Sequence, residues 1–414
     1  MHSEISYILV SLFLTAALLL TGHSAARGGD PDPERLASSY NGLGLSLYGL
    51  ISEKRPSENI FISPLSISLA LAMTYNGAGG ETMEEIAGIL RLEGCGREWI
   101  NRSNDELMGL LGDEIRGVRL DIANSLWCRK GLRFDPSFLR RTSDHFGAEA
   151  QSLDFGSPEA TSIINGWVSD RTEGMIDEVV SEISPLAVLF LINAVYFKGE
   201  WEEEFDPDET REDQFRTASG GLVPVQMMHH SGRFSYRRGE GYQAAALPYG
   251  DGRMSMYIVL PDSSSSLEEF RGRLSDAGGE DCLDPRLFSS RKGSIAIPRF
   301  RAEFDMGLRL LLEALGMVTA FDRAEADFSG MMRGGPAEIW IDDIFHKAVI
   351  EVTEKGTEAA AVTSVNIVAA SISMDEPFSM VLDRPFFFTI RDDETGTILF
   401  MGSIADPEPP EREW

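Results

Sequence analysis

The amino-acid sequence predicts an α+β protein in which helices and strands are interleaved along one chain. Segments with helical and with strand periodicity follow one another without the regular β-α-β alternation that builds a parallel sheet. The apolar fraction, 43% of 414 residues, is ample for a large core. Because no Pro/Ser-rich linker and no repeat divides the chain, we expect one large domain where length alone would suggest two or three.

The expected elements follow in order along the chain. Residues 59–90 predict helices, the first ending at Gly77–Gly80 and the next starting with Thr82 as its cap. Alternation or short apolar runs predict strands at residues 118–128, 186–197, 254–260, 293–300 and 345–353. Further helices are predicted at residues 163–179 and 306–315, the second stopped by Gly316. The run 186–197 is apolar almost throughout, which is typical of a central strand covered on both faces.

Residues 354–371 have the alternating pattern of a strand, although the irregular segment that follows them predicts a loop. Gly356 gives backbone freedom near the start, and the residues after it are small and almost uncharged. One face of the expected strand holds Thr357, Ala359, Ala361, Thr363, Val365 and Ile367, and the other holds Glu358, Ala360, Val362, Ser364 and Asn366. The following run, Ser371 to Asp383, is irregular. The pattern therefore predicts an exposed loop that can become a strand.

The segment Glu354–Ala361, Glu-Lys-Gly-Thr-Glu-Ala-Ala-Ala, resembles the reactive-loop hinge of the serpins, a family of suicide inhibitors of proteases. Five other segments resemble serpin motifs: Asn59–Ser66, Asn193–Gly199 with Trp201, Phe345–Ala348, Asp383–Phe388 and Leu399–Gly402. They occur in family order across about residues 33–407. The resemblance implies the serpin fold, with large, mostly antiparallel sheets, about eight to nine helices and an exposed reactive loop at about residues 356–383.

The resemblance also assigns structural roles to particular residues, none of them catalytic. It implies a hinge made of Glu354, Gly356, Thr357, Glu358, Ala359, Ala360, Ala361 and Thr363. It implies a shutter, which opens the main sheet, made of Ser63, Ser66, Asn193 and His346. It implies a breach at the top of that sheet, made of Trp201, Arg299 and Glu354. In this assignment Glu354 forms a salt bridge with Arg299, and His346 donates or accepts a hydrogen bond across the sheet.

The family's loop length, counted from Glu354, places the scissile bond at Ala370–Ser371. The small apolar residues before this bond suit elastase-like or subtilisin-like proteases, whose pockets are shallow or broadly accepting. The alternative scissile bond is Met374–Asp375. The choice depends on how many residues separate the scissile bond from Arg384 in this chain.

The function implied by the resemblance is suicide inhibition of a serine protease. The protease attacks the loop and forms an acyl-enzyme, and the loop from Thr357 onward then inserts between the strands that hold Asn193 and His346. The rival function is that of a non-inhibitory serpin, a carrier or storage protein. The uncharged inward face of the hinge argues against this rival, because a buried unpaired charge would cost several kcal/mol and stop insertion.

Enzymatic, metal and cofactor functions are not expected. The sequence has no Gly-x-Ser-x-Gly and no His-Glu-x-x-His motif. His229 and His230 are adjacent on an expected strand and would point to opposite faces. Asp206–Glu209 lacks the glycine and the closing glutamate of a calcium loop, so it predicts an acidic turn. Three widely spaced cysteines, Cys95, Cys128 and Cys282, predict free thiols.

The net charge of −29 excludes nucleic acid as an expected partner, because an acidic surface repels phosphates. Activation by a heparin-like polyanion is also not expected. The corresponding stretch, residues 97–112, carries Glu98, Asp105 and Glu106 against two arginines. The expected partner is a target serine protease held in a covalent acyl complex, and the inhibitor itself is expected to be a monomer.

The ends of the chain differ in composition from the rest. Residues 1–26 predict a cleaved secretory signal, because the apolar run Tyr7–Leu20 is followed by the small residues Ser24 and Ala26. Met1–Ser6 lacks the usual Lys or Arg, so an uncleaved membrane anchor stays open, although the run is short of the about 20 residues that span a bilayer. We therefore expect a secreted protein with its serpin domain at residues 27–407 and an acidic, Pro-rich tail at residues 408–414.

Overall fold

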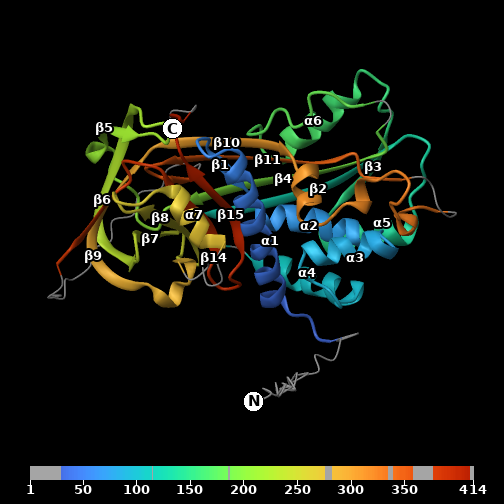
Figure 1. Ribbon diagram of the computed structural model, residues 1–414, viewed down its shortest axis with the longest axis horizontal. Coiled ribbons are helices and arrows are strands. Elements are labelled where there is room, and N and C mark those ends of the chain that lie inside the picture. The colour runs from blue at the N-terminus through green and yellow to red at the C-terminus, as the bar shows by residue number, and fades with distance from the viewer. Residues whose placement is uncertain are drawn as a thin grey trace, which may run out of the picture.

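The computed structural model describes residues 29–113, 115–184, 187–275, 282–333, 339–357 and 376–410. Helices surround two large sheets, which is the α+β architecture expected from the sequence (Figure 1). The described ranges contain eight α-helices: α1 Pro33–Lys54, α2 Pro64–Tyr75, α3 Gly80–Ile89, α4 Arg97–Leu111, α5 Pro136–Phe146, α6 Ala160–Arg171, α7 Leu267–Ser275 and α8 Arg309–Ala314. The predicted signal segment, residues 1–26, lies outside these ranges, and within them no helix is long and apolar enough to cross a membrane.

The six-stranded sheet runs across the middle of the molecule in the order β10-β11-β12-β4-β2-β3 (Figure 1). Its strands are β2 Val118–Arg129, β3 Glu149–Leu153, β4 Leu189–Glu200, β10 Phe300–Gly307, β11 Asp343–Thr353 and β12 Gly356–Thr357. β4 is central: it pairs antiparallel with β2 along its whole length and parallel with the first part of β11. This is the position that its continuous apolar run predicted.

The nine-stranded sheet follows the order β1-β15-β14-β8-β7-β6-β9-β13, with β5 paired to β6. Its strands are β1 Ile60–Ile62, β5 Arg211–Arg216, β6 Leu222–Gly239, β7 Tyr242–Tyr249, β8 Met254–Pro261, β9 Ser289–Pro298, β13 Phe378–Val381, β14 Phe386–Asp392 and β15 Ile398–Ile404. All its pairings are antiparallel except that of β13 with β9. The last strands of the chain therefore return into the core beside β1 and β8.

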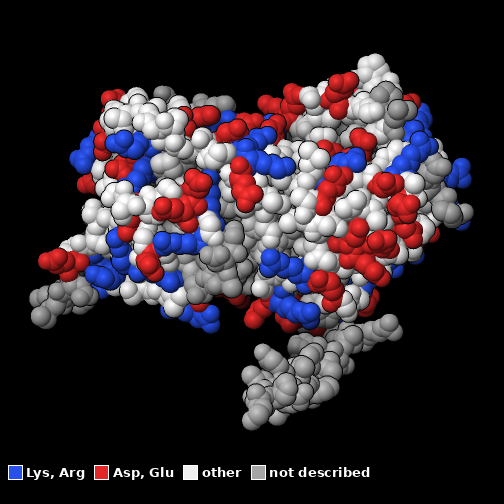
Figure 2. All heavy atoms as spheres, in the orientation of Figure 1, with Lys and Arg blue, Asp and Glu red and all other residues white. Residues whose placement is uncertain are grey.

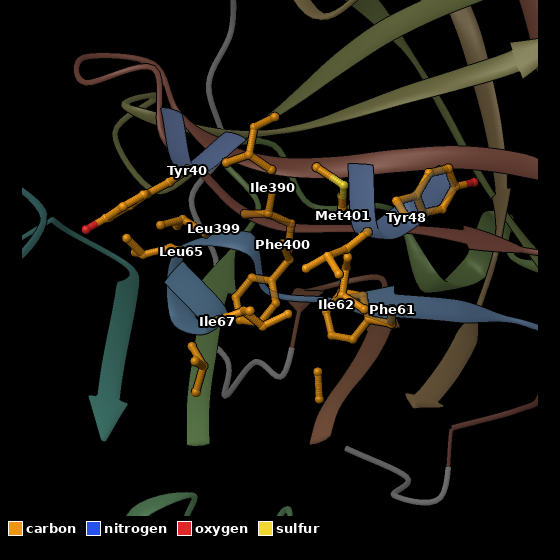
Figure 3. Close-up of a cluster of buried hydrophobic side chains, with 14 of the residues drawn as sticks. Tyr40, Tyr48, Phe61, Ile62, Leu65, Ile67, Ile390, Leu399, Phe400 and Met401 are labelled. Carbon is orange, nitrogen blue, oxygen red and sulfur yellow. The ribbon is translucent and has the colours of Figure 1, made fainter. Parts of the chain in front are cut away.

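The two faces of the six-stranded sheet have separate apolar cores. On one face, Ile164 and Val168 of α6 pack with Trp127 and Phe190 of the sheet. On the other face lies α2, every residue of which is buried, so its sequence is apolar all round rather than amphipathic. Phe61 just before α2 stacks on Phe400 of β15 with 5.1 Å between ring centroids, in the cluster drawn in Figure 3.

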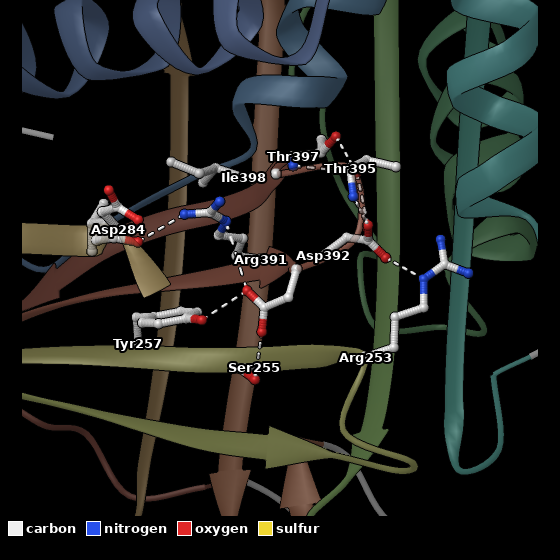
Figure 4. A network of polar contacts seen from close by, with 12 residues as sticks. Arg253, Ser255, Tyr257, Asp284, Arg391, Asp392, Thr395, Thr397 and Ile398 are labelled. Carbon is white, nitrogen blue, oxygen red and sulfur yellow. Dashed lines mark hydrogen bonds and ion pairs between the residues drawn. The ribbon is translucent and has the colours of Figure 1, made fainter. Parts of the chain in front are cut away.

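The turn between β14 and β15 is held by a buried ion pair (Figure 4). The Asp392 side chain is fully buried and accepts a hydrogen bond from Nε of Arg253 at 2.7 Å. It also accepts one from the Thr395 hydroxyl at 2.8 Å. Arg253 in turn donates to the carbonyl of Leu110 at the end of α4, at 2.7 Å. The bonds that satisfy this buried carboxylate thus tie the last hairpin to a distant helix.

Two helix ends differ from the sequence expectations. The helix expected over residues 163–179 ends at Arg171, because Glu173 (φ 52°) and Gly174 (φ 77°) take left-handed backbone conformations. Thr82 does not cap a helix: α3 starts after Gly79, and the Thr82 hydroxyl lies inside the helix, where it accepts a hydrogen bond from the backbone N–H of Asp327.

The expected helices at residues 59–90 and 306–315 each begin as a strand. Ile60–Ile62 pair with β15 before α2 starts, and Met306 still pairs with β11 as part of β10. α8 therefore begins only at Arg309, and Gly316 (φ 109°) follows its end as expected. In both cases pairing with a neighbouring strand overrides the local helical pattern.

Candidate functional site

Two strands of the six-stranded sheet, β4 and β11, are joined only near their two ends and do not pair with each other in between. β4 and β11 pair directly at residues 190–193 and 343–346, where they run parallel. At the far end β12 lies between them, antiparallel to both. We call the stretch in between, residues 194–198 of β4 and 347–351 of β11, the β4–β11 interval. A cavity of about 10 Å³ lies there, lined by both strands and closed by Thr357. A strand that continues from β12 would run directly into this interval.

Two residues of the predicted hinge, Gly356 and Thr357, are already part of the sheet as β12. Gly356 has φ 144°, and a Cβ atom there would lie 2.0 Å from the carbonyl oxygen of Gly199, so only glycine fits. The Thr357 side chain is buried, and its hydroxyl lies 2.7 Å from that of Tyr249. The backbone after Thr357 thus starts from a residue that is paired on both sides.

The structure brings together the three residues of the breach. Glu354 is 5% exposed, and Nε of Arg299 donates to its two carboxylate oxygens at 2.7 and 2.8 Å. The Thr210 hydroxyl donates a further bond to Glu354 at 2.6 Å. A buried carboxylate with these partners is satisfied, whereas removal of Arg299 would leave it largely uncompensated.

Trp201 covers the turn that leads into β12. Its indole Nε1 donates to the carbonyl of Thr353 at 3.0 Å, and its backbone N–H donates to the carbonyl of Lys355 at 3.0 Å. The indole also stacks on Tyr249 with 4.4 Å between centroids. Sequence reasoning missed Tyr249, the last residue of β7, and Thr210, which precedes β5, because no local pattern marks either residue. Together these contacts fix the start of the hinge.

The structure also joins three of the shutter residues. Nε2 of His346 accepts a hydrogen bond from the backbone N–H of Ser63 at 3.2 Å. The Ser63 hydroxyl donates to the carbonyl of Leu399 at 2.7 Å and accepts from the N–H of Ser66 at 3.3 Å, which caps α2. His346 lies directly opposite Asn193 in the parallel pairing of β11 and β4, although the side chain of Asn193 is outside the described part.

His346 is held in its neutral form. Since Nε2 accepts the bond from Ser63, the ring proton must reside on Nδ1, which has no hydrogen-bond partner among the described residues. Complete burial disfavours the charged imidazolium and lowers the pKa of His346 from 6.5 to about 4. Protonation would place a second N–H against that of Ser63, so acid breaks the contact between the main sheet and α2.

We expect acid to destabilise the protein through His346. Between pH 6.5 and about 4 the unfolded chain binds a proton at this residue and the folded chain does not, so stability falls as pH falls through this window. The full effect is about 3 kcal/mol. Urea unfolding at a series of pH values measures it. His346→Gln should remove this part of the pH dependence, and His145→Gln, which removes the 2.8 Å contact with Asp105 but leaves His346 in place, should keep it. Identical pH profiles for wild type and His346→Gln would contradict the assignment.

The predicted reactive bond lies outside the described residues. Residues 358–375 include Ala370–Ser371, the alternative Met374–Asp375, and the hinge residues Glu358, Ala359, Ala360, Ala361 and Thr363. The structure describes the two anchors of this segment. One is β12 in the six-stranded sheet, and the other is β13, which pairs parallel with β9 at the edge of the nine-stranded sheet.

The other sequence features that were considered as possible ligand sites, the adjacent histidines and the acidic segment Asp206–Glu209, lie in the described part of the structure. His230 bonds to Glu203 at 3.0 Å, and Asp206 caps the short 3₁₀ helix Pro207–Glu209, which is an acidic turn. In the described ranges no group of three or more His, Cys, Asp or Glu could hold a metal ion, and Cys95, Cys128 and Cys282 form no disulfide with one another. On the face drawn in Figure 2, Lys and Arg are scattered among Asp and Glu, a pattern typical of a solvated surface rather than of a polyanion-binding stripe.

Comparisons with known proteins match this chain over most of its length. A family model described as Serpin (serine protease inhibitor) matches residues 38–407. An uncharacterized serpin-like protein of Thermococcus kodakarensis is 37% identical over 397 residues, covering 95% of this chain and 90% of that protein. The leukocyte elastase inhibitor of Homo sapiens is 33% identical over 384 residues, covering 90% and 100%. The structure of a thermophilic serpin, tengpin, in the native state has a TM-score of 0.81 at 31% identity and covers 91% of this chain and 95% of that one.

Proposed function

This chain belongs to the serpin family and has its fold, as the sequence motifs predicted, and we propose that it inhibits serine proteases as a suicide substrate. Serpins are generally inhibitors rather than enzymes, and one relative is an elastase inhibitor by name. The observation that carries the proposal is the β4–β11 interval, which begins just after the hinge residues Gly356 and Thr357, and these two are already paired in the sheet.

In the proposed mechanism the protease itself releases the strand. Its serine attacks the carbonyl carbon of Ala370, the bond to Ser371 breaks, and the protease stays attached to Ala370 as an ester. The segment from Thr357 onward is then free at its far end and enters the β4–β11 interval. A strand of about 14 residues rises roughly 3.4 Å per residue, so the attached protease moves on the order of 50 Å. Distortion of its active site then stalls hydrolysis of the ester.

The inward face of the hinge fits this path. The Thr357 side chain points to the buried hydroxyl of Tyr249, and strand alternation would turn Ala359 and Ala361 to the same face. A new central strand makes about a dozen backbone hydrogen bonds at about 0.5–1.5 kcal/mol each, on the order of 10 kcal/mol in total. That gain is available only if no charged side chain enters the core.

The shutter lies where the sheet must open. Complete insertion requires residues 190–193 of β4 to separate from residues 343–346 of β11. His346 is in this paired region and is bonded to Ser63 at the start of α2. We infer that this contact holds the sheet closed until the loop is cut, so that insertion occurs with a protease attached and not before. The alternative is a carrier or storage role, and one comparison favours it: the structure of human thyroxine-binding globulin in complex with thyroxine resembles this chain with a TM-score of 0.82 at 27% identity.

The proposed target is an elastase-like or subtilisin-like protease, and the scissile bond can be tested by redirecting it. We expect Ala370→Arg to form an SDS-stable complex with trypsin, because the residue before the bond fills the specificity pocket of the protease. Met374→Arg is the matched variant and should not trap trypsin. Gel electrophoresis detects the complex, and sequencing the released peptide locates the cut. Trapping by Met374→Arg alone would move the bond to Met374–Asp375, and trapping of no protease from a panel by any form would contradict inhibition.

A further inference from the structure

Four strands of the six-stranded sheet carry a row of charged side chains on the face that α6 covers (Figure 1). Strand register places Arg119 of β2 opposite Lys198 of β4, and Glu351 of β11 opposite Arg301 of β10. Lys198 is eight residues after Phe190, which packs in the core below α6, so strand alternation puts the row on that face. The β4–β11 interval separates Lys198 from Glu351 and interrupts the row.

Three of the four charges in this row have an opposite charge bonded directly to them. Arg119 forms an ion pair with Glu173, in the segment that follows α6. Nε of Arg301 lies 3.4 Å from a carboxylate oxygen of Glu351, which is only 2% exposed. Lys198 forms no ion pair with a described residue. The hydrogen bond from Arg119 is the main cause that lowers the pKa of Glu173, and the charge of Lys198 adds a smaller contribution. The row thus holds one ammonium group to which no carboxylate is bonded.

The pairing of β12 determines which residue of an inserting strand would meet this row. Thr357 lies opposite the residue after Lys198 in β4 and opposite the residue after Glu351 in β11. In antiparallel pairing, one step forward on the new strand is one step back on each neighbour. The next residue, Glu358, would therefore lie between Lys198 and Glu351, although Glu358 itself is outside the described residues.

We propose that Lys198 is a positioning residue for loop insertion, which receives the carboxylate of Glu358 and so sets the register of the entering strand. The inference rests on the proposed inhibitory function. Opposite charges on facing residues stabilise a strand pair, and like charges destabilise it. On the other side of the interval, Arg301 offsets the charge of Glu351. A slip of one residue would turn the Glu358 side chain to the opposite face, into the core where Tyr249 lies.

Charge reversal at both positions tests this inference, with pancreatic elastase and subtilisin as the probes. Lys198→Glu should raise the number of inhibitor molecules consumed per protease trapped about threefold to tenfold, because three carboxylates would then meet in one row. It should also reduce the rise in melting temperature that follows cleavage. In protein that carries Glu358→Lys, the same change should lower the number consumed, because it restores an opposite pair. The control Lys130→Glu, at an exposed residue just after β2, should have no effect in either background.

The reversal of sign between the two backgrounds is the decisive result, because neither net charge nor a folding defect would harm one background and help the other. If Lys198→Glu acts equally in both, or in neither, the role of Lys198 is overturned while the inhibitory mechanism stands. If the wild-type protein neither traps a probe nor gains in melting temperature on cleavage, the proposed function fails and the inference with it. Lys198 is partly exposed, so its variants are expected to fold, and the melting temperatures of the uncut proteins check this.

Discussion

Cleavage of the reactive loop after Ala370 is expected to raise the melting temperature by on the order of 10 °C. The intact chain holds the β4–β11 interval open below Thr357, and cleavage frees the segment that fills it. Filling it gains on the order of 10 kcal/mol. The unfolding entropy is about 2.1 cal/mol/K per residue near 60 °C, so in a domain of about 380 residues each kcal/mol shifts the melting temperature by roughly 1.3 °C. Calorimetry on intact and singly nicked protein measures the shift.

This expectation is distinctive because a nick normally lowers stability by freeing a chain end. The control is the same nick in Ala359→Asp, in which the inserted strand would bury a charge. The nicked variant should show little or no rise in melting temperature. An unchanged or lower value for nicked wild-type protein would mean that the segment after Thr357 does not enter the sheet.

Ala359→Asp is also expected to convert the inhibitor into a substrate. Ala359 is two residues beyond the buried Thr357, and strand alternation would turn it to the same face, so an aspartate there would meet the core as the strand enters. The protease should still cut the loop, but deacylation should then outrun insertion. We expect the stoichiometry of inhibition, the moles of inhibitor consumed per mole of protease trapped, to rise on the order of tenfold or more.

Ala360→Asp is the matched control for this prediction. It introduces the same charge one residue later, on the face that already carries Glu358. We expect it to trap protease nearly as well as wild type. Gels for the covalent complex, run beside the inhibition assay, distinguish trapping from cleavage. Equal stoichiometry for Ala359→Asp and wild type would show that insertion of this face is not required.

The motifs of the sequence predicted much of the site because they lie on strands that are neighbours in the sheet. Glu354 immediately follows β11 and Arg299 immediately precedes β10, so the pairing of these two strands brings the residues together. His346 and Asn193 are likewise opposed by strand register. Gly356 was recognisable as a position of backbone freedom, and its φ of 144° is one that other residues rarely adopt.

The rest of the site depends on contacts that no local pattern encodes. Tyr249 reaches Thr357 from β7, and Thr210 reaches Glu354 from a turn between the two sheets. The buried pair of Arg253 and Asp392 is equally remote in sequence. Periodicity reports which face of an element is buried and not what lies against it. The predicted start of the helix at residue 306 was wrong for a related reason: Met306 belongs to β10 because it pairs with β11.

Hydrogen exchange of the backbone amides in the β4–β11 interval tests the central claim most directly. Among residues 194–198 and 347–351, the amides that point into the interval, and not toward β2 or β10, should exchange measurably in the intact protein and become strongly protected after cleavage at Ala370 or after complex formation with a protease. Protection in this interval arises from new strand pairing on both sides. Unchanged exchange there, in protein that is fully cleaved, would contradict insertion between β4 and β11 and with it the proposed mechanism of inhibition.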